Sequence, residues 1–200
     1  MSESRNFVYQ RIGAVSGIVS PIIAFVCILT AIKSYPTFSW TNNALSDLGV
    51  VSGITSSLFN LGLFVSGVLA FIFSIFGLFT YFGKSWISKI GSTVFGAATI
   101  ALIAISVFNE NFSPTHYLVS VAFFTLAPVA LFILTFGFWL SDQRRIAAFT
   151  VAVGAVAALP WILFFAFNYV PNVAIPEFLS ALAISVWAVV IGKKMLSPKI

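Results

Sequence analysis

The basic residues of this chain fall almost entirely in alternate gaps between long apolar runs. Lys33 alone lies in the other set of gaps. The remaining nine of the ten lysines and arginines share one set: Arg5, Arg11, Lys84, Lys89, Arg144, Arg145, Lys193, Lys194 and Lys199. Basic residues near the ends of membrane spans are retained on the cytoplasmic side. The pattern therefore predicts a multi-pass protein of the cell membrane with both termini in the cytoplasm.

The composition agrees with a membrane protein. The 200 residues are 60% hydrophobic and only 8% charged, and the mean hydropathy is +1.08. Soluble domains have about a quarter of charged residues. A net charge of +5 could indicate a nucleic-acid partner in a soluble protein. Here the cations border the apolar runs, so we expect membrane lipids with anionic headgroups as partners and no nucleic acid.

Six apolar runs are long enough to cross a membrane, which takes about 20 helical residues each. Backbone groups in hydrocarbon must bond within their own segment, and uninterrupted apolar runs lack the alternation of barrel strands. We therefore predict an all-α bundle of six transmembrane helices, N-in and C-in, forming one domain over residues 1–200. The predicted spans are 12–32, 57–82, 90–108, 116–140, 146–167 and 176–192.

Small residues and prolines inside the spans predict how the helices pack. Gly13, Gly17 and Pro21 repeat every four residues and form a narrow face that another helix can approach closely. We expect this face to pack within the bundle, and a homodimer contact is the alternative. Pro21, Pro128 and Pro160 lie inside spans and each should bend its helix.

Tryptophans near the ends of spans predict where the bundle meets the membrane interface. Trp86, Trp139 and Trp187 occupy such positions. An indole ring has one polar edge and suits the boundary between lipid tails and water. We therefore interpret all three as interface anchors.

Acidic residues are distributed opposite to the basic ones. Asp47, Glu110 and Glu177 are predicted outside, together with the single histidine, His116. Short loops confine these groups to a small area above the bundle, so a functional site is expected there. The spans themselves contain no confidently buried charge, which disfavours ion transport through the bundle.

The most polar stretch between spans is residues 40–49, Trp-Thr-Asn-Asn-Ala-Leu-Ser-Asp-Leu-Gly. It predicts a short helical turn that Asn43 caps and Gly49 ends in a left-handed conformation. Leu45 and Leu48 would share a face packed on the bundle. One interpretation is a solvated, capped turn; the other places Asp47 at the mouth of a cavity as a proton carrier, ligand anchor or metal ligand.

The stretch Asn43-Ala-Leu-Ser-Asp-Leu-Gly49, followed by Asn60 and Gly62, resembles the domain-of-unknown-function 998 family of six-span prokaryotic membrane proteins. His116, just before the fourth predicted span, is similar to a histidine of that family. The resemblance implies six spans over almost the whole chain and a polar site at this end. The family carries no settled biochemical activity, so the resemblance implies no reaction.

The leading functional hypothesis is a non-catalytic protein that binds a lipid or another amphiphile. Its pocket would lie in the outer half of the bundle, with Asn43, Asp47, Asn60 and His116 contacting the headgroup. The many phenylalanines suit an alkyl chain, and we expect a cavity of roughly 300 Å³ or more. No catalytic residue and no cofactor is assigned.

Two alternatives remain open. A metal-assisted lipid hydrolase would use Asp47, Glu110, His116 and Glu177 to hold an ion that activates water. Such sites usually contain two or three histidines, whereas this chain has one. The third hypothesis is an accessory subunit of a larger membrane complex, which would make the polar cluster structural.

Overall fold

The fold of this chain is all-α, as the apolar runs predict. The computed structural model describes residues 3–82 and 85–197, and this part contains helices but no strand. Six of its helical segments are long and apolar enough to cross a membrane. They are α1 (Glu3–Lys33), α2 (Ile54–Ile72) continued by η2 (Phe73–Leu78) and α3 (Phe79–Tyr81), α4 (Trp86–Val107), α5 (Thr115–Leu140), α6 (Arg144–Phe167) and α7 (Ala174–Leu196). The predicted spans are therefore confirmed to within a few residues, apart from longer ends on α1 and α7.

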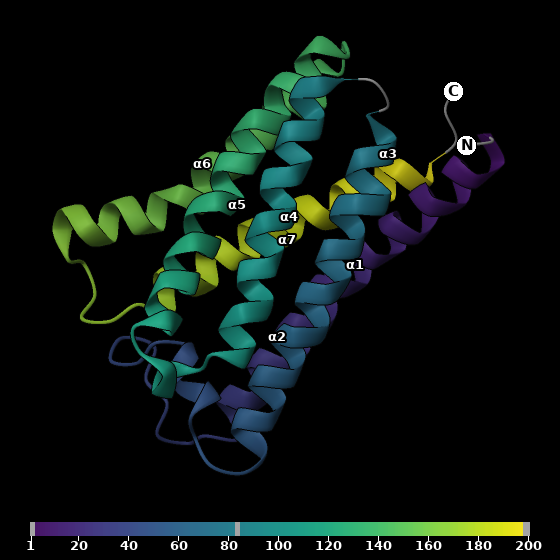
Figure 1. Ribbon diagram of the computed structural model, residues 1–200. Coiled ribbons are helices and arrows are strands. Elements are labelled where there is room, and N and C mark those ends of the chain that lie inside the picture. The colour runs from purple at the N-terminus through teal and green to yellow at the C-terminus, as the bar shows by residue number, and fades with distance from the viewer. Residues whose placement is uncertain (1–2, 83–84, 198–200) are drawn as a thin grey trace.

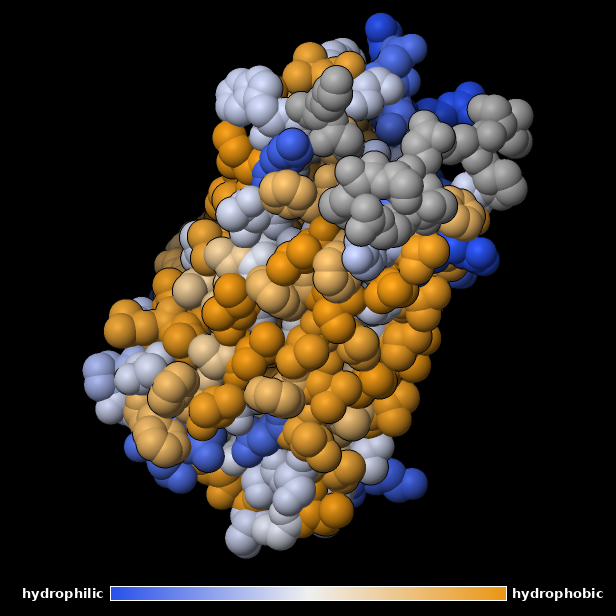
Figure 2. Space-filling model, turned by 45° about the vertical axis from the view of Figure 1, so that its right-hand side comes forward, coloured by the Kyte–Doolittle hydropathy of each residue, from blue (hydrophilic) through white to orange (hydrophobic). Residues whose placement is uncertain are grey.

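The helices run up and down, so that α1 begins and α7 ends at the same end of the bundle (Figure 1). We call this the basic end, because Arg11, Lys89 and Arg144 lie near it. Lys84 and Lys199, from the predicted basic set, lie outside the described residues. The opposite end is called the acidic end and carries Asp47, Glu110 and Glu177. One face of the molecule shows an apolar belt between hydrophilic ends (Figure 2).

The second span changes its winding toward its C-terminal end, where η2 forms a π-helical turn between α2 and α3. This turn packs directly on α1. A Cβ atom added to Gly13 would lie 2.1 Å from the backbone nitrogen of Gly77, and one added to Gly17 would lie 2.5 Å from the Phe73 ring. The small-residue face of α1 thus packs within the bundle, as predicted, and is covered by this chain itself.

The three span prolines lie inside helices α1, α5 and α6, as predicted. The clearest effect is in α6, whose C-terminal part turns away from the other helices (Figure 1). Pro160 lacks an N–H and cannot continue the backbone bonding there. Beyond it, Phe165 and Phe167 are 72% and 74% exposed.

The three tryptophans do not share one role. Trp86 and Trp139 are 68% and 56% exposed, which fits the predicted interface positions. Trp187 is completely buried, so its prediction as an anchor is wrong. Its indole N–H donates to the hydroxyl of Thr150 at 3.1 Å, and its ring packs beside that of Phe95. A buried indole whose polar edge is satisfied by a neighbouring helix is a core residue.

Candidate functional site

The polar stretch between α1 and α2 forms a short helix at the acidic end. This helix, η1 (Ser46–Gly49), is a single 3₁₀ turn. Leu45 and Leu48 are buried on the bundle, as predicted, with 5% and 0% of their surface exposed. The η1 turn is therefore anchored by its apolar side chains, which fixes the position of the polar groups around it.

Asn43 does not cap η1 in the predicted manner. Its side-chain oxygen accepts from the backbone N–H of Ser39 at 2.9 Å, and its amide group donates to Asp47 at 2.5 Å. The same Asp47 oxygen also accepts from the backbone N–H of Ala44 at 3.1 Å. The carboxylate of Asp47 thus reaches back to the residues just before η1, and Asn43 links that carboxylate to the preceding loop.

Gly49 is required for a different reason from the predicted one. Within the described residues, the glycine with a positive φ is Gly53, at 89°, so the left-handed prediction for Gly49 is wrong. A Cβ atom on Gly49 would lie 2.7 Å from the side-chain oxygen of Asn60. The Asn60 amide group donates to the carbonyl of Gly49 at 2.9 Å. Gly49 therefore permits the close contact between η1 and α2.

Residues 43–47, which we call the clamp segment, bind all three carboxylates of the acidic end. Besides the bonds to Asp47, the hydroxyl of Ser46 donates to Glu110 at 2.6 Å. The backbone N–H of Leu45 donates to Glu177, also at 2.6 Å. Glu110 and Glu177, from two other parts of the chain, thus converge on the short segment that carries Asp47, as the short loops predicted. Their individual bonds could not be predicted from the sequence.

The elements that carry Glu110 and Glu177 are themselves fixed locally. Glu110 begins η3 (Glu110–Phe112), a 3₁₀ turn between α4 and α5, where the side chain of Asn109 accepts from the N–H of Asn111 at 3.2 Å. Glu177 lies in the first turn of α7. The start of α7 is bonded to the clamp segment, because the N–H of Ala174 donates to the carbonyl of Asn43 at 3.0 Å.

The acidic end has an excess of negative charge. Burial raises the pKa of Glu110 above its ordinary value, and the neighbouring Asp47 carboxylate raises it further, while the Ser46 hydroxyl and His116 lower it. The ion pair found among the described residues, between Arg144 and Asp142 at 3.4 Å, lies at the basic end. Among the described residues, none of the three carboxylates forms an ion pair, so they depend on hydrogen bonds, on one another and, for Glu110, on His116.

His116 is held by a backbone carbonyl. It is 9% exposed, and its Nδ1 atom lies 2.7 Å from the carbonyl oxygen of Phe108. A carbonyl only accepts, so Nδ1 must carry the proton, which leaves Nε2 available as the second ring nitrogen. This arrangement fixes the tautomer of the neutral ring and the direction of Nε2.

The predicted metal ligands do not assemble into a metal site. Among residues 3–82 and 85–197, no group of three or more His, Cys, Asp or Glu side chains is placed to hold a metal ion. The predicted set was Asp47, Glu110, His116 and Glu177. Their carboxylates are directed to the clamp segment rather than to a common point. This donor geometry does not fit a bound cation of the kind that the hydrolase hypothesis requires.

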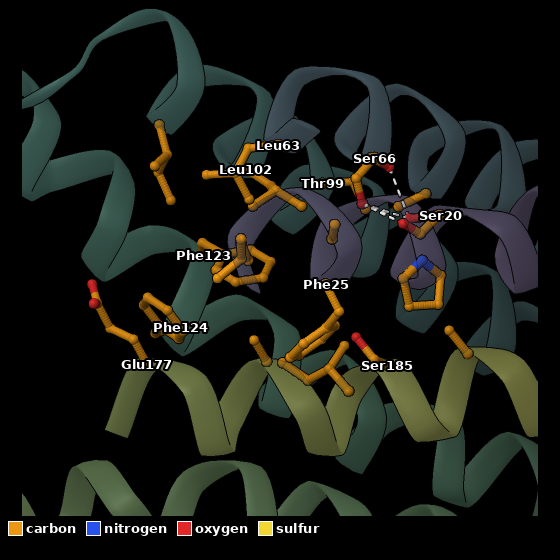
Figure 3. Close-up of a pocket in the computed structure, with 18 of the residues that line it drawn as sticks. Ser20, Phe25, Leu63, Ser66, Thr99, Leu102, Phe123, Phe124, Glu177 and Ser185 are labelled. Carbon is orange, nitrogen blue, oxygen red and sulfur yellow. Dashed lines mark hydrogen bonds between the residues drawn. The ribbon is translucent and has the colours of Figure 1, made fainter. Parts of the chain in front are cut away.

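A cavity of about 100 Å³ lies beneath the clamp segment. It is lined at the acidic end by Leu45, Ser46 and Glu177, and its wall includes residues from α1, α2, α4, α5 and α7. Figure 3 shows Glu177, Phe124 and Phe123 toward one end and the bonded pair Ser20 and Ser66 toward the other. The prediction of roughly 300 Å³ or more is therefore wrong, and the cavity has room for no more than part of a single alkyl chain.

The predicted headgroup contacts lie around the cavity rather than in its lining. Asn43, Asp47, Asn60 and His116 are absent from the residues that form its wall. The carboxylate that reaches the wall is Glu177, which is only 7% exposed. The expectation that the spans hold no buried charged residue is therefore wrong at Glu177. The sequence signal for this residue is its place after Pro176 at the start of an apolar run, where a helix N-terminus stabilises a carboxylate.

Six apolar helices with a short polar turn fixed across one end define a polytopic α-helical membrane protein. The chain belongs to the family described as protein of unknown function (DUF998), whose sequence profile matches residues 18–193. The resemblance seen in the stretch from Asn43 to Gly49 is thereby confirmed. No curated protein and no solved structure matches the chain.

Proposed function

We propose that this protein binds a single-chain amphiphile, or one alkyl chain of a lipid, in the cavity beneath the clamp segment. The observation that supports the proposal is a small, mainly apolar cavity with a buried carboxylate, that of Glu177, toward one end. An amphiphile has the matching division into a long apolar part and a polar end. The limited volume favours one chain over the two chains of an ordinary phospholipid.

The deep end of the cavity suits the end of an alkyl chain. Three of the hydroxyl groups in its wall are already bonded within the protein. Ser20 and Ser66 each donate to the other's backbone carbonyl at 2.9 Å. Thr99 donates to the carbonyl of Gly96 at 2.7 Å. Polar groups that are satisfied internally need no polar partner from a ligand. The surrounding phenylalanine and leucine side chains then contact the chain.

Selectivity must arise at the polar end. In a membrane the surrounding lipid tails are as apolar as the cavity, so moving an alkyl chain from the bilayer into the protein gains little hydrophobic free energy. Glu177 and Ser46 are the polar groups at this end of the wall. Asn43 and Asp47 hold the clamp segment in place, and direct contact of Asn43, Asp47, Asn60 or His116 with a headgroup stays a prediction.

The proposal is tested by photolabelling the detergent-solubilised protein with a ten-carbon alcohol that carries a diazirine on its chain. We expect labelled residues from the cavity wall, such as Leu102 and Phe123, and loss of this labelling with excess unlabelled decanol. Ala181→Phe fills part of the cavity and should abolish the labelling. Ala155→Phe, on an exposed face of α6, is the matched control. Labelling confined to lipid-facing residues such as Leu61 would overturn the proposal.

We also propose that the basic end faces the cytoplasm and that the protein lies in the cell membrane. The supporting observation is that Arg11, Lys89 and Arg144 lie near one end of the bundle. Basic residues near span ends are retained on the cytoplasmic side. Cysteines introduced at Asn42 and Asp142, with Cys27→Ser removing the native thiol, provide the test in intact cells. A thiol reagent that does not cross membranes should label position 42 and spare position 142; the reverse result would invert the orientation.

A further inference from the structure

We propose that the headgroup bound at the cavity is a protonated amine, so that the site selects cationic single-chain amphiphiles over neutral and anionic ones of equal length. This inference rests on the proposed amphiphile binding and specifies its ligand. Three features of the cavity support it: the unfilled bonding capacity of the buried Glu177 carboxylate, the negative charges around that residue, and the aromatic rings in the cavity wall.

Glu177 is a buried carboxylate with an unfilled bonding capacity. It is 7% exposed and forms part of the cavity wall. One oxygen, Oε2, accepts from the N–H of Leu45 at 2.6 Å. Among the described residues, the N–H of Leu45 is the donor to this carboxylate, and no donor reaches Oε1. A carboxylate offers about four acceptor positions, and an ammonium group carries three N–H donors that can use them.

The charges around Glu177 favour a cation over an anion. Asp47 lies in the clamp segment and Glu110 is bound to it, and the described residues provide no ion pair to any of the three carboxylates. The lysine at this end, Lys33, is exposed at the end of α1. A buried charge without a partner is costly, whereas a close opposite charge offsets that cost. An anionic headgroup would add to the repulsion, and an ammonium group would relieve it.

Two aromatic rings, those of Phe123 and Phe124, line the same cavity as Glu177. Figure 3 places Phe123 and Phe124 between the Glu177 carboxylate and the middle of the cavity. The two rings meet edge to face, with centroids 4.9 Å apart. The face of an aromatic ring attracts a cation, most strongly where water is excluded. An ammonium group bonded to Glu177 would therefore have a second favourable contact before the alkyl chain continues toward Ser20.

The test compares decylamine, decanol and decanoate as competitors of the diazirine alcohol at neutral pH, where the amine is protonated. Decylamine should displace the probe at a concentration at least about tenfold lower than decanol, as expected for one hydrogen bond between charged groups. Decanoate should be the weakest. Glu177→Gln keeps an acceptor for Leu45 and should bring the amine-to-alcohol ratio close to one. Asp142→Asn, at an exposed carboxylate of the basic end, should leave the ratio unchanged.

The outcomes separate this inference from the function on which it rests. Equal displacement by all three compounds would overturn the amine headgroup and leave amphiphile binding intact. Displacement by none would overturn amphiphile binding itself. Phe124→Leu keeps every charge and should lower the amine-to-alcohol ratio only in part. An unchanged ratio in Glu177→Gln, with decanol still competing, would also overturn the assignment.

Discussion

The backbone N–H of Leu45 donates to the side chain of Glu177 at 2.6 Å, although 132 positions separate the two residues. Leu45 precedes η1, and Glu177 lies in the first turn of α7. Both residues are buried. This bond therefore joins the connection between the first two spans to the start of the last span. It fixes the clamp segment over the cavity at the same place where Glu177 enters the cavity wall.

Replacement of Glu177 should show how much this bond contributes to stability. Glu177→Leu removes the acceptor and leaves a buried backbone N–H unsatisfied, which costs about 1–3 kcal/mol. Glu177→Gln removes the charge but keeps a side-chain oxygen. We expect the leucine variant to unfold at a lower temperature than the glutamine variant, and its Leu45 amide to exchange hydrogen faster. Thermal unfolding in detergent and hydrogen exchange provide the measurements.

The glutamine variant is the control here, because the two variants share the loss of the buried carboxylate. Any cost or gain from removing that charge cancels in the comparison. Equal unfolding temperatures and equal exchange at Leu45 would mean that the clamp segment is held by its apolar anchors, Leu45 and Leu48, without help from α7.

A methyl group on Gly49 should disrupt the contact between η1 and α2. The added Cβ would lie 2.7 Å from the side-chain oxygen of Asn60, so Asn60 must move and lose its bond to the Gly49 carbonyl. We expect Gly49→Ala to destabilise the protein by about 1–3 kcal/mol, as overpacking usually does. The measurement is the free energy of unfolding in a mild detergent.

The double variant provides the control for this contact. Asn60→Ala removes the side-chain oxygen that the new methyl group meets, which is also a buried atom without a partner among the described residues. Gly49→Ala should therefore cost less in the Asn60→Ala background than in the wild type, a non-additivity typical of residues in contact. Strictly additive effects would place the cost of the methyl group elsewhere, in the backbone of η1.

The spans were predictable from the sequence because a membrane imposes one requirement on every residue of a run. Each run must be apolar and helical, so boundaries such as 115–140 against the predicted 116–140 follow from local composition. The gathering of Asp47, Glu110 and Glu177 at one end also followed, since alternating spans leave short loops on the same side. These features need no knowledge of which helix contacts which.

The features that were mispredicted all depend on contacts between distant elements. Trp187 has the local pattern of an interface residue, and only its packing against α4 and α6 buries it. Gly49 looks like a helix stop, and only Asn60 from α2 reveals the actual constraint. Glu177 becomes part of the cavity because η1 folds over it. The π turn at η2 likewise has no local signature; it accompanies the contact of Gly77 with Gly13.

Glu110 should make stability depend on pH. Burial, followed by the nearby Asp47 carboxylate, raises the pKa of Glu110 above its ordinary value of 4.5. Above pH 4.5 the unfolded chain releases this proton while the folded protein still holds it. The stabilisation from Glu110 is thus complete below the unfolded pKa and is lost as the pH rises through the folded pKa.

Glu110→Gln isolates this contribution. Glutamine does not titrate, so it carries no pH dependence of its own. As the pH is raised from about 4 toward 8, through the raised pKa of Glu110, the unfolding temperature of the wild type should fall relative to that of the variant. Ser46→Ala removes the hydroxyl that lowers the pKa of Glu110 and should shift the loss to higher pH. Parallel profiles for wild type and Glu110→Gln would show that burial does not perturb this carboxyl group.

Trp187 and Trp86 form a matched pair for testing which tryptophan belongs to the core. Trp187→Phe removes the N–H that bonds to Thr150 at 3.1 Å and leaves a small void beside Phe95. A bond between membrane helices contributes about 0.6–2 kcal/mol, and the lost ring volume adds to this cost.

Trp86 is 68% exposed, so Trp86→Phe keeps its contacts with the bundle and should change the unfolding free energy by less than about 0.5 kcal/mol. Thr150→Val tests the bond separately, because it removes the acceptor while keeping the volume. If Trp187→Phe and Trp86→Phe lowered the unfolding free energy equally little, Trp187 would have to face lipid, and its contacts with Phe95 of α4 and Thr150 of α6 could not exist.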